Sequence, residues 1–257
     1  MKISIVTVVL NGAELLPRTI ESVQTQDWPD VEHIIVDGAS ADASVDVIRG
    51  YASRCPERVK WISEHDSGLY DAINKGIDMA SGDVVGVLHA GDFYHRSDAL
   101  RLVAQALGED VRLRGIYADV RMVRAHDLNR VVRRYTSVHF RPWMFRMAMM
   151  PAHPSFFTYR STFEDYGLYR TDMSIAADFE MLLRLIYVNK LPVRYLPVDL
   201  LTMLTGGVSD SGFSSKMEIN RQDLRALRQH DVWSCMPLLW LRYPVKLWQY
   251  ADAWLRP

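Results

Sequence analysis

The chain has 257 residues, of which 49% are hydrophobic and 24% charged, as is usual for one large water-soluble globular domain. Its net charge of −1 gives no support for nucleic acid as the main partner. No segment approaches the roughly 20 consecutive apolar residues of a membrane-spanning helix. Cys55 and Cys235 lie far apart and lack the spacing of a zinc site, which indicates reduced packing residues in a cytosolic protein.

Strands and helices are predicted in alternation along the first half of the chain. Continuous β-branched runs, typical of strands covered on both faces, lie at 3–10, 33–36, 59–62, 84–88 and 115–123. Apolar residues at helical spacing occupy the intervening segments 14–24, 45–51, 67–80 and 97–107. This order predicts an α/β fold with a doubly wound, mostly parallel, Rossmann-like sheet.

The second half is less regular. A short strand, a helix and a further strand are expected at 155–159, 178–188 and 193–201. Pro197 predicts that the last of these lies at a sheet edge. Residues 144–150 are rich in methionine and aromatic side chains, for which core packing is favoured over a lip facing lipid or acceptor. The basic stretch 121–134 is interpreted as a solvated loop, and the Gly/Ser/Asp-rich loop 205–215 is long enough to suggest a function.

The last segment, residues 231–257, is predicted to be an amphipathic aromatic tail. It contains four of the seven tryptophans, interleaved with basic residues: Trp233, Trp240, Trp248 and Trp254 with Arg242, Lys246 and Arg256. This composition favours a helix at the headgroup depth of a membrane, and a helix docked on the domain is the alternative. Pro237 and Pro244 argue against one continuous helix in either case.

Single acidic residues follow two of the predicted strands. Asp92 comes after the buried run that ends at Leu88, and Asp37 comes after His-Ile-Ile-Val. Strand ends on one side of a parallel sheet converge, so the two carboxylates are expected to share a cleft. Asp37 is a candidate acceptor of hydrogen bonds from a ribose or base, with a turn or helix cap as the equal alternative.

The sequence lacks the glycine-rich loops that usually hold phosphates. No GxGxxG or GxxxxGK[ST] motif occurs, so a diphosphate ligand needs another counter-charge. A divalent cation, Mg²⁺ or Mn²⁺, on Asp92 supplies it, and one carboxylate is chemically sufficient because Mg²⁺ keeps water and phosphate ligands.

Asp178 opens the predicted helix in AADFEMLLR and has two interpretations. It is a helix N-cap, or it is a general base that deprotonates an acceptor hydroxyl, and the two are compatible. Glu180 is the weaker candidate because it points to a different helix face. His153, in AHPSFF, is a candidate phosphate or second metal contact, for which a structural role is favoured.

Taken together, several segments resemble the family-2 inverting glycosyltransferases with the GT-A fold. They cover most of residues 1–190, and their order and spacing make the resemblance specific: ISIVTVVLNGAELLPRTIESVQTQ, VEHIIVDGASADAS, DSGLYDAINKGIDMASGDVVGVLHAGD, HPSFFTYR and AADFEMLLR. The segment DSGLYDAINKG with the later GGVS is similar to bacterial transferases of exopolysaccharide, colanic-acid-type and cell-wall glycolipid assembly.

The resemblance implies a nucleoside-diphosphate sugar donor, a glycan or lipid-linked acceptor, Mn²⁺ or Mg²⁺, and a cytoplasmic location, peripheral on the inner membrane through 232–257. Residues 1–230 would form the catalytic domain, with a nucleotide-sugar half (1–125) and an acceptor half (126–230). The implied donor-side residues are Thr7, Val9, Asn11, Glu14, Asp37, Asp66, Asp71, Asn74, Lys75, His89, Ala90 and Gly91, with Asp92 on the metal. Asp178 would be the base, and Glu180, Gly206, Gly207 and Ser209 would lie at the acceptor and a loop near the diphosphate.

One departure from the family pattern bears on the metal. The family usually carries two acids at the strand end, whereas here Gly91 precedes Asp92, so the second ligand is undetermined. Two other functions stay open on the sequence. A sugar-1-phosphate nucleotidyltransferase is disfavoured because residues 11–14 lack a Gly- and Arg/Lys-rich loop, and a catalytically weak nucleotide-binding paralogue draws its main support from Gly91.

Overall fold

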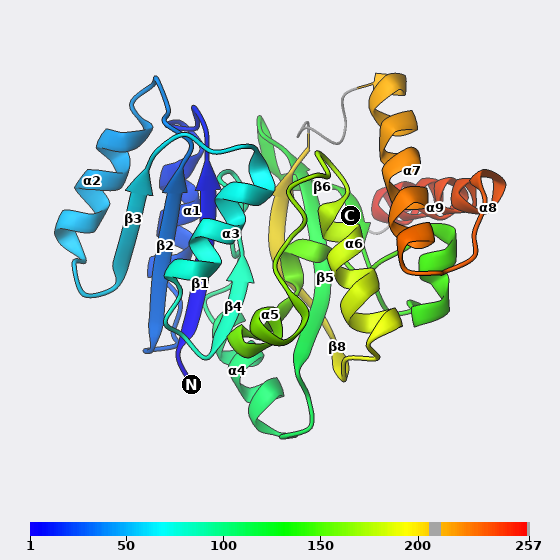
Figure 1. Cartoon of the computed structure of the whole chain (residues 1–257). Helices are drawn as coiled ribbons and strands as arrows, with labels where there is room; N and C mark the ends of the chain where they lie inside the picture. The colour runs from blue at the N-terminus through cyan, green and yellow to red at the C-terminus, as the bar shows by residue number, and fades with distance from the viewer. Residues whose placement is uncertain (206–211, 256–257) are drawn as a thin grey trace.

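The structure is a computed structural model that describes residues 1–205 and 212–255. Within these ranges, residues 212–214 and 252–255 are described by their backbone alone. One sheet runs through the molecule in the order β3-β2-β1-β4-β7-β5-β6, and β8 pairs with β5 (Figure 1). The strands are β1 (Ile3–Val9), β2 (Val31–Asp37), β3 (Val59–Ser63), β4 (Val84–Val87), β5 (Gly115–Arg124), β6 (Asp127–Tyr135), β7 (Phe157–Tyr159) and β8 (Val193–Leu204).

Six of these strands run in the same direction. β1 to β4 pair in parallel, and so do β5 and β8. β7 is antiparallel to both β4 and β5, which makes β4 and β5 point the same way, and β6 returns antiparallel to β5. The carboxyl ends of β1 to β5 and β8 therefore meet at one edge of the sheet, as the sequence predicts for a mostly parallel α/β fold.

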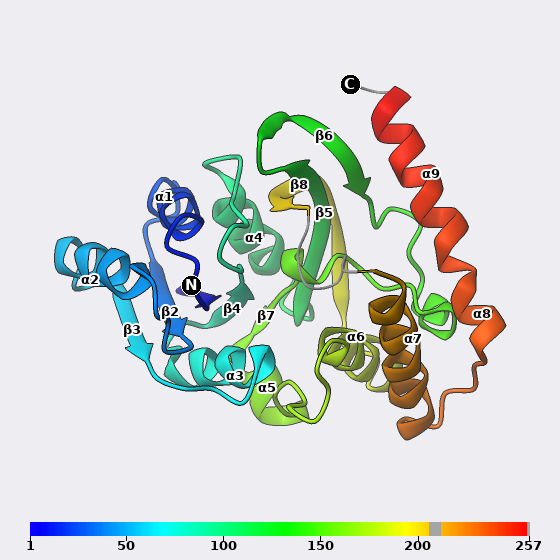
Figure 2. The ribbon, with the colours of Figure 1, turned by 90° about the horizontal axis from the view of Figure 1, so that it is seen from above.

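Helices cover both faces of the sheet (Figure 2). The helices are α1 (Leu16–Gln24), α2 (Ser44–Arg54), α3 (Leu69–Met79), α4 (Ala99–Gly108), α5 (Arg160–Tyr166), α6 (Ala177–Leu182), α7 (Gly212–Gln229), α8 (Met236–Trp240) and α9 (Arg242–Leu255). α1, α2 and α4 pack on one face, while α3 and α6 pack on the other, each through a cluster of buried aliphatic and aromatic side chains. None of the helices, over the residues that the structure describes, is long and apolar enough to cross a bilayer.

Two sequence-based expectations are corrected by the fold. The stretch 121–134 is a β-hairpin of β5 and β6 rather than a solvated loop. The arginines of this stretch suggest exposure to solvent. Arg133 is nevertheless buried, because Gln249 of α9 covers it and accepts its hydrogen bond. Asp178 is also no N-cap, since α6 begins at Ala177 and Ala176 holds the cap position. α6 continues as a π-helical segment, Leu183–Val188, so the helix expected over 178–188 is present in two geometries.

The predicted tail is docked on the domain by one face. α9 lies beside β6, and α8 packs against a 3₁₀ turn, Pro142–Met147 (Figure 2). Within the methionine-rich stretch 144–150, Phe145 is fully buried and packs against Phe179, as expected for core packing. β8 pairs only with β5 among the named strands, so the edge position predicted from Pro197 is confirmed.

Candidate active site

Asp92 follows β4 at the carboxyl edge of the sheet and is buried. Its side chain is 6% exposed and accepts a hydrogen bond from the backbone N–H of Leu204, at the end of β8. Burial raises its pKa from 3.8 to about 7 because a low-dielectric site penalises the charged form. The hydroxyl of Thr19 on α1 braces the turn, since it donates to the Asp92 carbonyl and accepts from the Gly91 N–H.

Gly91 explains the departure from the family pattern at this turn. Its φ is +100°, a backbone conformation that residues other than glycine adopt only with strain. A second carboxylate at this position would therefore need a different turn. Among the described residues, no group of three or more His, Cys, Asp and Glu side chains lies in an arrangement that would hold a metal ion.

Asp37 ends β2 at the same edge and is fully buried. Its Oδ2 accepts hydrogen bonds from the Ser40 N–H and the Ser63 hydroxyl, while Oδ1 is buried without a hydrogen-bond partner. An unpaired buried carboxylate oxygen is costly in a protein interior, which makes Oδ1 a candidate acceptor for a ligand or a water molecule. The Asp66 carboxylate lies against Gly38, because a Cβ at Gly38 would come within 2.6 Å of its Oδ2.

Asp178 on α6 is linked to the end of β4 by two histidines. His153 Nδ1 lies 3.0 Å from Asp178 Oδ2, and the His153 ring meets the His89 ring edge-on at 6.1 Å between centroids. His89 is three residues before Asp92, so Asp178 and Asp92 belong to one region although 86 positions separate them in the sequence. Burial and the neighbouring His153 lower the pKa of His89 to about 3, which keeps its imidazole neutral.

A tyrosine completes the surroundings of Asp178. The Tyr70 hydroxyl donates to the Ile175 carbonyl and lies 3.2 Å from Asp178 Oδ1. Burial and the adjacent carboxylate raise the pKa of Tyr70 above its ordinary value, so it stays protonated. Tyr70 has no role in the sequence-based prediction, although it lies inside the segment DSGLYDAINKG; an apolar helix face at Tyr70 and Ile73 gives no sign of this contact.

Several predicted donor-side residues make contacts within the protein. The Thr7 hydroxyl is buried against His33 Nε2, and Asn11 Oδ1 accepts from the Ala41 N–H. Asn74 exchanges two hydrogen bonds with the Tyr169 backbone. Lys75 pairs with Glu64 at 2.8 Å and with Asp71 at 3.7 Å. The remaining members have varied surroundings: Val9 is buried, Glu14 is exposed and Ala90 is half-buried.

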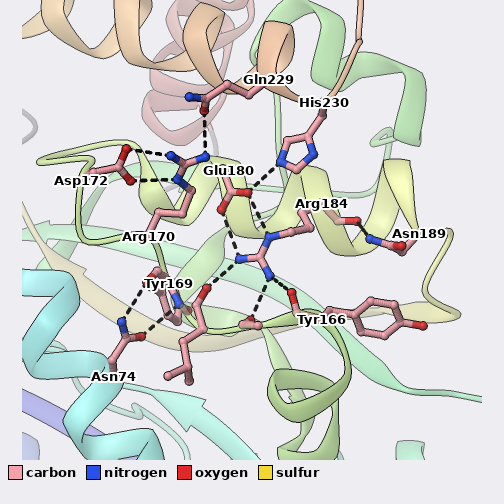
Figure 3. A network of polar contacts seen from close by, with 12 residues as sticks. Asn74, Tyr166, Tyr169, Arg170, Asp172, Glu180, Arg184, Asn189, Gln229 and His230 are labelled. Carbon is pink, nitrogen blue, oxygen red and sulfur yellow. Dashed lines mark hydrogen bonds and ion pairs between the residues drawn. The ribbon is translucent and has the colours of Figure 1, made fainter.

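For two of these residues, Thr7 and Asn74, the contacts argue against the predicted role in binding the donor. The Thr7 side chain faces the interior, where it bonds His33 on β2, so it is not carried into the proposed donor site. Asn74 has its amide engaged in holding α3 to the loop around Tyr169, which Figure 3 shows. β1 is a central strand in which all seven residues are buried, so Thr7 is covered by the protein whichever face of the sheet it points to.

Glu180 lies in a buried polar network rather than beside Asp178 (Figure 3). It is 1% exposed; its Oε1 contacts Arg184 and, at 2.7 Å, His230 Nε2, and its Oε2 contacts Arg184. Glu180 is not carried into the proposed acceptor site, because its side chain is 1% exposed against 14% for Asp178 and is paired with Arg184 and His230. Gly206, Gly207 and Ser209 lie outside the described residues. Leu204, close to the last described residue before them, donates its backbone N–H to Asp92.

A family comparison agrees with this arrangement. The sequence model of "Glycosyl transferase family 2" matches residues 4–164, more than half of the chain. The chain belongs to glycosyltransferase family 2. A PGL/p-HBAD biosynthesis glycosyltransferase of Mycobacterium bovis is 30% identical over 202 residues, which cover 76% of this chain and 73% of that protein. An uncharacterized glycosyltransferase of Mycobacterium tuberculosis is 36% identical over 187 residues, covering 71% and 68%.

Solved structures show the same fold. Staphylococcus aureus TarS 1–349 in complex with UDP-GlcNAc has a TM-score of 0.69 at 16% identity, over 88% of this chain and 66% of that one. The mannosyltransferase PcManGT from Pyrobaculum calidifontis, in complex with GDP-Man and Mn²⁺, has a TM-score of 0.64 at 17% identity, over 98% and 73%. The chain thus spans about two thirds of the TarS fragment. The sequence-based assignment to family-2 transferases with the GT-A fold is confirmed.

Proposed function

We propose that this family-2 glycosyltransferase moves a sugar, with inversion, from a nucleoside-diphosphate sugar to a hydroxyl of a glycan or lipid-linked acceptor. The observation that carries the proposal is the side-chain series His89–His153–Asp178, which joins α6 to the strand end that bears Asp92. This series supports the proposal that Asp92, which could hold a cation, and Asp178, which could remove a proton, act on the same pair of substrates.

Asp178 is the proposed general base. His153 contacts one of its oxygens and the Tyr70 hydroxyl lies against the other, so the carboxylate keeps one direction when an acceptor hydroxyl approaches. Proton removal from that hydroxyl lets its oxygen attack the anomeric carbon while the nucleoside diphosphate leaves from the opposite side. The transition state has oxocarbenium character, as in sugar transfer generally. One displacement of this kind inverts the anomeric centre and needs no covalent sugar–enzyme intermediate.

The nucleoside end of the donor is assigned to Asp37 and its surroundings. The unpaired Oδ1 of Asp37 is an acceptor ready for an N–H or O–H of the base or ribose. Ser40 and Ser63 hold the other oxygen, so the carboxylate is oriented before the ligand arrives. Asp66, Asp71, Lys75 and His89 remain proposed neighbours of the donor, with Val9, Asn11, Glu14, Ala90 and Gly91 along its path.

The residues at the strand end fit a divalent cation held mainly by the donor's phosphates. Asp92 is a buried carboxylate, and a bound cation would offset the cost of burying its negative charge. Mn²⁺ or Mg²⁺ bound by Asp92 would stabilise the negative charge of the departing diphosphate. His153 is assigned to Asp178 instead of the cation because its Nδ1 faces that carboxylate.

The relatives suggest the substrate classes. TarS is seen with UDP-GlcNAc and PcManGT with GDP-Man and Mn²⁺, which supports a nucleotide sugar and a divalent cation here. The M. bovis relative is named for PGL/p-HBAD biosynthesis, which supports an acceptor in surface glycolipid or polysaccharide synthesis. We place this reaction in the cytoplasm, at the inner face of the membrane.

The base assignment is tested by Asp178→Asn with Asp172→Asn, an exposed carboxylate six positions earlier, as the matched control. Removing a positioned base typically lowers turnover by about 10²–10⁴-fold. We expect that loss for Asp178→Asn, with UDP or GDP affinity by calorimetry within about twofold of wild type, and little change for Asp172→Asn. Equal loss of nucleotide binding and transfer would contradict the assignment. NMR of the product's anomeric proton would separately test inversion.

A further inference from the structure

α9 is built inside out relative to a helix of a water-soluble protein, whereas α8 buries the apolar Leu239 in the core. Over residues 242–251, where the structure describes the side chains of α9, the buried ones are polar, Arg242 and Gln249, while the exposed ones include Leu247 at 70% and Trp248 at 53%. A surface helix normally turns its apolar stripe to the core and its polar face to water. We define the aromatic surface as the exposed side chains of Trp233, Trp240, Leu241, Val245, Leu247, Trp248 and Tyr250.

Specific polar contacts hold the helix in this orientation. Arg242 pairs with Asp223 Oδ2 at 2.5 Å and donates to Asn220 Oδ1, both on α7. The Gln249 side-chain oxygen accepts from Arg133 of β6, another buried residue. Rotating α9 to bury its apolar face would strip these buried charges of their partners, which is costly. The apolar face is therefore fixed outward by contacts that the described residues make.

Two basic side chains flank the aromatic surface. Between Asp231 and Asp252 the sequence holds no acid, and its charged residues are Lys246 and Arg242, of which Arg242 is buried against Asp223. Lys246 is exposed and lies 5.9 Å from the Tyr243 ring, and Arg146 lies 5.1 Å from the Trp233 ring. Tryptophan rings with flanking cations are the composition found at the headgroup level of membranes.

We propose that the aromatic surface docks on an anionic phospholipid bilayer, with its tryptophans at headgroup depth. A second copy of the chain is the less suitable occupant, because a two-fold contact through this surface would bring Lys246 and Arg146 of the two copies toward each other. The bilayer supplies both an apolar layer and anionic phosphates. This inference deepens the proposed membrane location; vesicle binding requires no turnover, so it stands or falls separately from the transferase activity.

The test compares vesicle binding of the full chain with that of a double variant, Leu247→Glu with Trp248→Glu. The matched control is Val111→Glu, which changes an apolar side chain 91% exposed in the loop between α4 and β5. Vesicles of phosphatidylcholine alone and with phosphatidylglycerol are pelleted, and bound protein is measured. We expect wild type and Val111→Glu to pellet with the anionic vesicles and the double variant to bind at least about tenfold more weakly.

Further measurements distinguish a bilayer from a second copy of the chain as the partner of the aromatic surface. Tryptophan emission of the wild type should shift to the blue on anionic vesicles and be quenched by brominated lipid, and both effects should shrink in Trp248→Phe. Circular dichroism should show that the double variant keeps its fold, because the changed side chains are exposed. The proposal is overturned if wild type stays in the supernatant with anionic vesicles, if the double variant binds as tightly, or if light scattering shows a dimer that the double variant loses.

Discussion

Asp92 should make the ligand-free protein less stable as the pH rises, and its isosteric replacement by asparagine should remove that effect. The carboxylate is buried, and its pKa is about 7 in the folded protein against 3.8 ordinarily. Protonation is therefore favoured in the folded state. The stability that this gives is fully present below pH 3.8 and is lost as the pH rises through about 7.

The magnitude follows from the separation of the two pKa values. Roughly three pH units at about 1.4 kcal/mol each give an upper limit of about 4 kcal/mol. Solvent relaxation around the ionised group reduces this, so we expect Asp92→Asn to be about 2–4 kcal/mol more stable than wild type at pH 8 and nearly equal at pH 4. The asparagine oxygen can still accept the hydrogen bond from Leu204.

The assay is urea unfolding of both proteins in metal-free buffer from pH 4 to pH 8. Asp78→Asn, which removes a carboxylate from the exposed side of α3, is the control and should show no comparable gain. A difference between Asp92→Asn and wild type that stays constant across this range would refute the burial argument. With Mn²⁺ and UDP added at pH 8, the order should reverse, because ligands that need the carboxylate stabilise only wild type.

Three further predictions concern His153, Asp37 and Arg242. His153→Gln should lower transfer by roughly 10–100-fold and alter its pH profile while leaving nucleotide affinity by calorimetry unchanged, since a misdirected Asp178 slows proton removal. Asp37→Asn should weaken UDP or GDP binding about tenfold, because the unpaired Oδ1 is replaced or displaced; unchanged affinity would remove Asp37 from the site. Arg242→Met should cost about 3–5 kcal/mol in urea unfolding by leaving Asp223 buried without its partner, whereas Arg112→Ala, at an exposed pair, should cost less than about 1 kcal/mol.

The sequence by itself was enough for the fold class and for placing two acids, Asp37 and Asp92, at the carboxyl edge of the sheet. Runs of β-branched residues separated by helical spacing report local burial, and local burial is written in the order of the residues. A carboxylate directly after a buried strand must lie at the sheet's carboxyl edge once the strands are parallel, which places Asp37 and Asp92 without knowledge of any distant contact.

Only the tertiary structure decided which polar side chains meet. Asp178 and Glu180 stand two positions apart in one helix, yet the first meets His153 and Tyr70 and the second is sealed between Arg184 and His230. The outward apolar face of α9 depends in the same way on Asp223 and Arg133, which belong to other elements. Hydrogen bonds and ion pairs act over a few ångströms between residues far apart in the chain, so one sequence lists these partners without showing which are brought together.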